Sequence, residues 1–375
     1  MTTKSGEGWT LHNGDSAEVL AGFPENSLEV CITDPPYFLG AEPDVCALIA
    51  AWLAGKEYKL GRGFMSNEWD GYLPGPRIWR QVHRVLKPGA HVLAFGGPRT
   101  FDLLTLALRL SGFEIRDAMA WLYGSGFPKS LNVAKALWAA GNEAAADAWD
   151  GFGTALKPAW EPIILARKPL SGTVCANVLA HGTGALNIDA ARIPAEPWSK
   201  NTNTDRELGA LEPQNSGTKW GLRIVEKHSN EAGRFPANVL LDEEAAAELD
   251  RQEPGASRFF YTAKAPKSER EAGLDAHELK PAGGMEGRRD GSLGSEPVRR
   301  KNSHPTVKPL DLMEYLVTLA TPPGGTVLDP FNGSGSTGCA ALRSGFSYIG
   351  IELSPEYFET SAGRLAHFAF DSFMQ

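Results

Sequence analysis

A glycine-rich motif near the C-terminus constrains the fold most. The apolar run 326–329 predicts a strand, and residues 333–338 read Gly-Ser-Gly-Ser-Thr-Gly, which matches the pattern G-x-G-x-x-G. A helix is expected to follow over 339–344, and a second strand over 347–351 leads into Glu352. An acidic residue at the end of the second strand, about 20 residues after the first glycine, is suited to binding ribose hydroxyls. The motif in this setting predicts a site for a nucleoside cofactor.

The position of this motif predicts the order of the strands. After Glu352 the sequence has room for one helix, over 355–368, so the remaining strands of the sheet are expected from the N-terminal half. The strand that leads to Asp15 should follow that helix in the sheet. A nicotinamide dehydrogenase would open with its glycine-rich loop, whereas this chain closes with it. The sequence therefore predicts an α/β fold with a circularly permuted, doubly wound, mostly parallel sheet.

Strand and helix patterns alternate through the first 170 residues, as is typical of a parallel sheet covered by helices. Strands are expected at 9–13, 28–33, 91–95, 115–122 and 160–166, and helices at 16–23, 78–86, 100–110 and 134–148. We interpret residues 1–170 as the catalytic half of one domain and 301–375 as its cofactor-binding half. Residues 171–300, rich in Gly, Asn, Ser and Pro, are interpreted as an irregular insertion that recognises the target.

The tetrapeptide Asp34-Pro35-Pro36-Tyr37 follows the expected strand at 28–33. Two successive prolines stiffen the turn, so they would hold the Asp34 carboxylate and the Tyr37 ring at the carboxyl end of a strand, where open α/β sheets bind ligands. A carboxylate and a backbone carbonyl can accept both N–H bonds of an exocyclic amine, while an aromatic ring stacks on an extruded base. The alternative is an ordinary Asp-Pro turn in which Tyr37 only contributes to packing.

Composition narrows the classes of partner. The four cysteines lie far apart, which favours neither a disulfide framework nor a zinc site. The N-terminus lacks the apolar core of a signal sequence and no apolar run is long enough to span a membrane, so a cytoplasmic location is expected. The net charge of −8 weakly opposes nucleic-acid binding, but a local surplus of Lys and Arg between 258 and 301 is either a binding surface or a solvated loop.

The chain resembles the permuted β group of S-adenosylmethionine-dependent DNA amino-methyltransferases, particularly its solitary or phage-borne members. Five motifs that occur in the order of that group carry the resemblance: Asn13-Gly14-Asp15, Asp34-Pro35-Pro36-Tyr37, His304-Pro305-Thr306-Val307-Lys308-Pro309, Asp329-Pro330-Phe331 with Gly333 to Gly338, and Ile349-Gly350-Ile351-Glu352. As an isolated pattern, the motif at 304–309 could equally be a turn that leads into a helix over 310–319.

The resemblance implies S-adenosylmethionine as cofactor and duplex DNA as substrate, and members of the group often form homodimers. It implies that Glu352 holds the ribose and Asp15 the adenine amine, and that Phe331 and the loop from Gly333 to Gly335 lie near the methionine part. The predicted cofactor-binding residues are Asp15, Asp34, Thr306, Lys308, Asp329, Phe331, Gly333, Ser334, Gly335 and Glu352. The predicted catalytic residues are Asp34, Pro35, Pro36 and Tyr37, and no metal is expected.

The expected reaction is direct methyl transfer to the N6 amine of a flipped adenine. Adenine is preferred over cytosine N4 because the resembled group ties Asp at position 34 to adenine and Ser to cytosine. Physical reasoning alone allows either amine. A methyltransferase that acts on RNA or on a protein amide, and a relative that binds without catalysis, are the remaining alternatives. Damage to the Asp-Pro-Pro-Tyr tetrapeptide or to the glycine-rich loop would favour a relative that binds without catalysis, and both motifs are intact.

Overall fold

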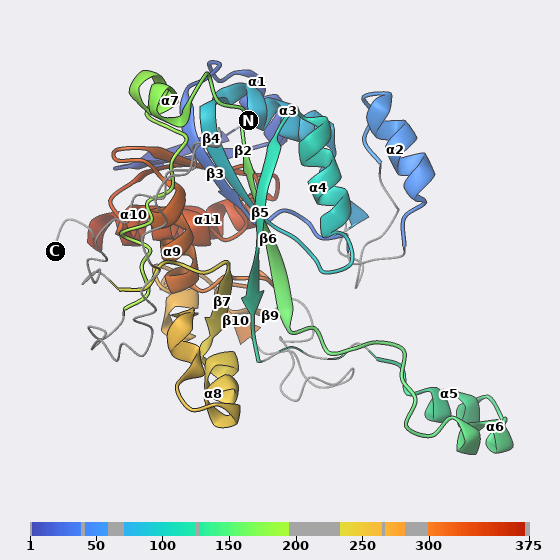
Figure 1. The fold of residues 1–375 in the computed structure, drawn as a ribbon. Coiled ribbons are helices and arrows are strands. Elements are labelled where there is room, and N and C mark those ends of the chain that lie inside the picture. Colours follow the sequence, from blue (N-terminus) through green and yellow to red (C-terminus); the bar gives the residue numbers. More distant parts are fainter. Residues whose placement is uncertain are drawn as a thin grey trace, which may run out of the picture.

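One ten-stranded sheet forms the centre of the protein (Figure 1). The computed structural model describes residues 2–38, 42–58, 71–124, 126, 128, 130–194, 233–264, 267–281 and 299–371. In order across the sheet, the strands are β1 (Thr2–Gly6), β2 (Trp9–Asn13), β12 (Ser347–Glu352), β11 (Thr326–Asp329), β3 (Leu28–Thr33), β4 (Leu86–Phe95), β6 (Trp160–Arg167), β5 (Glu114–Leu122), β7 (Val239–Asp242) and β8 (Tyr261–Ala263).

The central strands have the permuted order that the sequence predicts. Strands β2, β12, β11, β3 and β4 are parallel neighbours, so the last two strands of the chain lie between two of its first strands. Glu352 on β12 lies opposite Asn13 on β2. The direction of the strand order reverses between β11 and β3, which makes the carboxyl ends of these two strands the expected place for a ligand.

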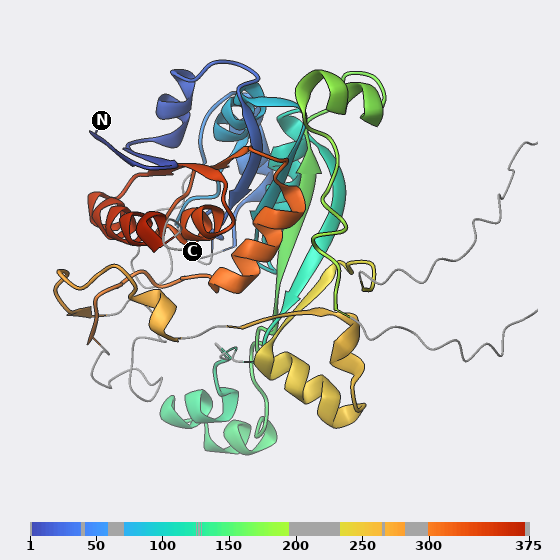
Figure 2. The ribbon, with the colours of Figure 1, turned by 90° about the vertical axis from the view of Figure 1, so that its left-hand side faces the viewer.

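Helices cover both faces of the sheet because the strands are apolar on both sides. On β3, Val30 and Ile32 face one core and Cys31 faces the other. Helices α9 (Leu310–Ala320), α10 (Ser336–Arg343) and α11 (Pro355–Asp371) contribute to the first core, and α1 (Ser16–Ala21), α2 (Val45–Leu53), α3 (Pro76–Val85) and α4 (Phe101–Leu110) to the second. The three C-terminal helices, drawn in orange to red, gather on one side of the sheet in Figure 2.

Between β5 and β6 the chain leaves the body of the protein and forms two short helices, α5 (Val133–Ala139) and α6 (Glu143–Ala148). They lie well away from the sheet in Figure 1. The sequence predicted one helix over 134–148, which was wrong because Gly141 adopts a positive φ of 79° and ends the first helix. We refer to residues 130–157 as the arm.

The segment 171–300 is more regular than predicted. Its described part contains α7 (Val174–His181), α8 (Glu243–Gln252), two short 3₁₀ turns (Ala256–Phe259 and Lys267–Arg270), and the strands β9 (Lys280–Pro281) and β10 (Arg299–Arg300). It also supplies β7 and β8, which extend the main sheet in parallel from β5. The interpretation of this segment as an irregular insertion did not anticipate these two strands, which are too short to show a period. Residues 195–232 and 282–298 lie outside the described residues.

The described part of the chain contains no helix that combines the length and apolarity needed to cross a membrane. Within the same ranges, no three His, Cys, Asp or Glu side chains come together as a metal site would require.

Candidate active site

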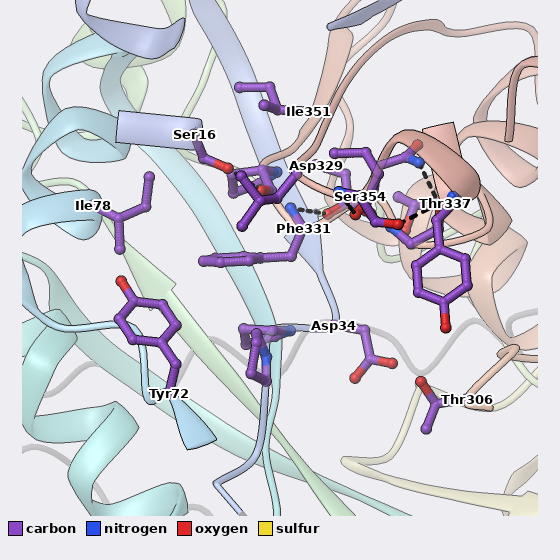
Figure 3. A pocket seen from close by; sticks show the side chains of 18 of the residues that line it. Ser16, Asp34, Tyr72, Ile78, Thr306, Asp329, Phe331, Thr337, Ile351 and Ser354 are labelled. Carbon is purple, nitrogen blue, oxygen red and sulfur yellow. Dashed lines mark hydrogen bonds between the residues drawn. The ribbon is translucent and has the colours of Figure 1, made fainter. Parts of the chain in front are cut away.

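A pocket of about 540 Å³ lies at the carboxyl ends of β2, β12, β11 and β3. Its lining includes these predicted residues: Asp15, Asp34, Pro35, Pro36, Tyr37, Thr306, Lys308, Asp329, Phe331, Gly333, Ser334 and Glu352. Gly335 is not part of the lining and instead precedes α10 as its N-cap. Figure 3 shows Asp34 and Thr306 on one side of the pocket, Ile78 and Tyr72 on the opposite side, and Phe331 between them. The fold thus brings both ends of the sequence to one cavity.

Glu352 fixes the glycine-rich loop at one end of the pocket. Its carboxylate accepts hydrogen bonds from the backbone N–H groups of Gly333 at 2.7 Å and Ser354 at 2.8 Å. Burial raises the pKa of Glu352 to about 7, although these two hydrogen bonds oppose the increase. Gly333 has a φ of 53°, and a Cβ there would lie 2.9 Å from the ring of His304. Only glycine therefore suits this turn.

Arg364, which sequence reasoning missed, holds the same loop from α11. Its side chain is fully buried, and its guanidinium donates to the backbone carbonyl of Ser334 at 2.7 Å and to the Ser334 hydroxyl at 3.1 Å. An arginine on the apolar face of the expected helix over 355–368 was the signal that could have revealed it, because such a charge is rarely buried without partners.

Asp329 connects β11 to β3, the two neighbouring strands between which the strand order reverses. Thr33 donates its hydroxyl to Asp329 Oδ1 at 2.6 Å, and the N–H of Phe331 donates to the same oxygen at 3.0 Å. Burial raises the pKa of Asp329 to about 6. Because Thr33 directly precedes Asp34, this contact fixes the position of the tetrapeptide relative to the Asp329-Pro330-Phe331 turn.

Asp15 begins α1 and also faces the pocket. It accepts a hydrogen bond from the N–H of Glu18 at 3.0 Å as the N-cap of the helix, and its carboxylate lies 3.4 Å from the Arg77 guanidinium. Arg77 and Tyr72 line the pocket as well and were not predicted. Burial, followed by the charge of Glu57, raises the pKa of Tyr72, which keeps its hydroxyl neutral.

The segment 304–309 forms a wall of the pocket as well as the entry to a helix. Helix α9 starts at Leu310 with Pro309 as its N-cap, while His304, Thr306 and Lys308 line the pocket. His304 packs edge-on against Tyr357 with ring centroids 4.5 Å apart. Burial lowers the pKa of His304 to about 3, so its imidazole is neutral near pH 7.

The Asp34 carboxylate has one anchored oxygen and one free oxygen. Lys308 Nζ lies 2.6 Å from Asp34 Oδ2, whereas Asp34 Oδ1 is buried and has no hydrogen-bond partner among the residues that the structure describes. The same ammonium lies 3.2 Å from Glu161 Oε2, at the start of β6. Glu161 was missed because its place at the site depends on β6 running antiparallel to β4, which the sequence does not reveal.

Comparison with known proteins identifies the family of the chain. The model of a family described as DNA methylase, which groups N6 and N4 methyltransferases, matches residues 28–363, most of the chain. The chain belongs to this family of DNA methyltransferases. The predicted family and the permuted α/β fold are confirmed.

Individual relatives show how the similarity is distributed. Type II methyltransferase M.HindIII of Haemophilus influenzae is 22% identical over 95% of this chain and 94% of its own length. DNA adenine methyltransferase YhdJ of Escherichia coli is 44% identical, but only over 17% of this chain and 21% of its own length.

Two solved structures illustrate the structural comparison. The M1.HpyAVI–SAM complex shows 17% identity, covers 95% of this chain and 98% of its own, and has a TM-score of 0.43. The PvuII DNA methyltransferase, described as cytosine-N4-specific, shows 16% identity, covers 96% of this chain and 87% of its own, and has a TM-score of 0.48.

Proposed function

We propose that this protein transfers the methyl group of S-adenosylmethionine to the N6 amine of an adenine flipped out of duplex DNA. The observation that carries the proposal is Asp34 Oδ1, a buried acceptor without a partner among the described residues, on a residue that lines the pocket beside the glycine-rich loop. A buried acceptor without a partner is costly, so the site is built for a donor that arrives with the substrate.

The residues of the pocket fit this cofactor. The Glu352 carboxylate has lone pairs left for ribose hydroxyls after accepting two N–H groups, and Asp15 can accept from an adenine amine. Phe331 lies between the two sides of the pocket, next to the loop at 333–335 (Figure 3). Bound there, S-adenosylmethionine supplies an electrophilic methyl group on its sulfonium.

The tetrapeptide provides the groups that act on the amine. An exocyclic amine is a poor nucleophile because its lone pair is conjugated with the ring. Asp34 Oδ1 and the carbonyl of Pro35 accept its two hydrogens, which favours a tetrahedral nitrogen, and the negative carboxylate stabilises the positive charge that grows on it. Tyr37 stacks on the flipped base and reduces the cost of unstacking it.

The choice of adenine rests on the first residue of the tetrapeptide. Asp34 matches the association of Asp with adenine in the resembled group, and YhdJ, which is similar over a short segment, is named an adenine methyltransferase. The family model that matches the chain groups N6 and N4 methyltransferases and does not distinguish the two bases. Cytosine N4 is therefore the competing outcome in the experiment below.

Sequencing of modified DNA tests the proposal directly. Plasmid from a methylation-free host that expresses the wild-type protein should contain N6-methyladenine in one short motif, and digestion to nucleosides followed by mass spectrometry identifies the base. Asp34→Ala should abolish the modification while the protein still binds S-adenosylmethionine. N4-methylcytosine in the wild-type sample would overturn the base assignment. Unmodified DNA from a folded, cofactor-binding protein would contradict the function.

A further inference from the structure

Four polar side chains from three separate segments of the chain contact one another around Asp34, at the wall of the pocket. Lys308 Nζ contacts Asp34 Oδ2 at 2.6 Å, Glu161 Oε2 at 3.2 Å and the Tyr37 hydroxyl at 3.1 Å. Tyr37 donates its hydroxyl to Glu161 Oε2 at 3.0 Å. The side chain of Lys308 is 7% exposed, and those of Asp34 and Glu161 are 17% and 18% exposed. We call these residues the carboxylate cluster.

The cluster decides which oxygen of Asp34 meets the substrate. With Oδ2 bound to the ammonium, the carboxylate cannot rotate freely, and Oδ1 is left as a buried acceptor without a partner among the described residues. The position of Tyr37 is fixed at its hydroxyl by Glu161 and Lys308. Fixed donors and acceptors cost no reorganisation during the reaction, so this arrangement is suited to catalysis by positioning.

Glu161 also sets the charge of the cluster. Lys308 alone would neutralise Asp34 and remove the negative charge that favours methyl transfer to a neutral amine. Burial opposes the charge on Lys308, but the two carboxylates together raise its pKa above the ordinary value, so the ammonium persists. Two carboxylates and one ammonium leave a net charge of −1 beside the amine.

We propose that Glu161 and Lys308 are positioning residues for methyl transfer. Lys308 orients Asp34 so that Oδ1 faces the amine, and Glu161 holds Lys308 and Tyr37 while restoring the negative charge. This inference rests on the proposed function, because it assigns roles at the same site. It also gives Lys308 a task other than the cofactor contact that the sequence suggested.

Other charged or titratable groups near Asp34 are few among the described residues. Asp329 on β11 acts on it through its charge, and neutral His304 lies beside Lys308 on the same wall. Each of these groups is unchanged in the variants below, so a difference between variants reports on the cluster.

The test compares single-turnover methyl transfer by the full-length protein between pH 5.5 and 9. Lys308→Met leaves two carboxylates in a buried site without a cation, which raises the pKa of the pair. We expect the rate to fall about 100-fold. The acid limb of the pH–rate profile, where the rate declines as pH falls, should move up by about one pH unit. Adding Glu161→Gln to Lys308→Met should return the acid limb toward the wild-type pH. Lys308→Arg should retain the wild-type limb, because it keeps the charge.

Glu161→Gln alone tests the charge argument. We expect the rate to fall about tenfold with an unchanged KM for S-adenosylmethionine, because this variant neutralises the cluster without touching the cofactor side. The matched control is Lys87→Met, which removes a Lys–Glu pair with Glu29 at the other end of the sheet. It should lower stability but not the rate. A Lys308→Met rate within threefold of wild type, with an unmoved acid limb, would overturn the proposal.

A second measurement separates this proposal from the proposed function. The melting temperature of Lys308→Met should fall more steeply than that of wild type as pH rises from 4 to 8, because the folded pKa of the unpaired carboxylates is raised. The Lys308→Met/Glu161→Gln double variant should flatten this slope. An absence of any slope difference contradicts the coupling even if the protein modifies DNA. A slope difference in a protein that modifies no DNA supports the coupling and contradicts the function.

Discussion

At the scale of single residues, the pocket places acidic groups in two different environments. Glu352 and Asp329 are buried and have raised pKa values of about 7 and 6. Glu161 and Asp34 share an ammonium that compensates their burial. The site therefore has a carboxylate that titrates near neutral pH on the side of the expected cofactor, and an anchored pair on the side of the base.

Cofactor binding should depend on the ionisation of Glu352. The ionised carboxylate accepts ribose hydroxyls more strongly than the protonated acid, so we expect the Kd for S-adenosylmethionine to rise as pH falls below about 7, by up to about tenfold per unit. Isothermal titration calorimetry between pH 5.5 and 8.5 measures this dependence. Glu352→Gln should bind weakly at pH 8 with a flatter profile. A wild-type Kd that is constant across this range would contradict the assignment.

At the scale of elements, the glycine-rich loop takes its shape from helix α11 as much as from its own glycines. Gly335 has a φ of 80°, and a Cβ there would lie 2.5 Å from the Ser361 hydroxyl of α11. Arg364 binds the loop at Ser334 from the same helix. The loop is therefore clamped between its own turn and a helix that follows it in sequence.

Removal of Arg364 should loosen this clamp. Arg364→Met keeps much of the buried volume but leaves the Ser334 carbonyl without its donor, so we expect the free energy of unfolding to fall by about 1–3 kcal/mol. Affinity for S-adenosylmethionine should fall with it, because the loop lines the pocket. Chemical denaturation and calorimetry measure the two effects. Arg343→Met removes the ion pairs of the exposed Arg343 with Glu269 and Glu314 without touching the loop, and it is the control, with a smaller expected loss.

Elements with a strong pattern were predictable from the sequence, and those that depend on a partner strand were not. The strand–loop–helix at 326–344 and the acidic residue at the end of β12 define their own environment, as do the prolines after β3. Glu161, β7 and β8 take their places from the antiparallel β6 and the free edge of β5, which are long-range pairings. Four or fewer strand residues carry no period that would reveal such a pairing.

At the scale of the whole molecule, the arm is an appendage whose helices are almost entirely exposed. No residue of α5 and only Ala146 of α6 is buried. The two sides of the arm meet at its base, where Asn132 pairs with Gly153 in an isolated bridge. Its roots are the end of β5 and the start of β6, directly before Glu161.

Excision of the arm should therefore preserve the fold. Replacing residues 133–152 by a short Gly/Ser linker between Asn132 and Gly153 is expected to change the free energy of unfolding by less than about 1 kcal/mol, because it removes almost no buried surface. Chemical denaturation measures this value, and a circular dichroism spectrum controls for the native sheet. A loss of several kcal/mol would show that the arm packs on the body.

The permuted strand order also affects how the protein is made. Strands β2 and β3 leave the ribosome early, but β11 and β12, which separate them in the sheet, are synthesised about 290 residues later. At a synthesis rate of roughly 5–20 residues per second, the edges of β2 and β3 that pair with these strands stay unpaired in the nascent chain for roughly 15–60 s. Unpaired edges invite pairing with other chains. Translation speed and chaperones that shield strand edges should therefore influence the yield of this methyltransferase more than that of an unpermuted relative.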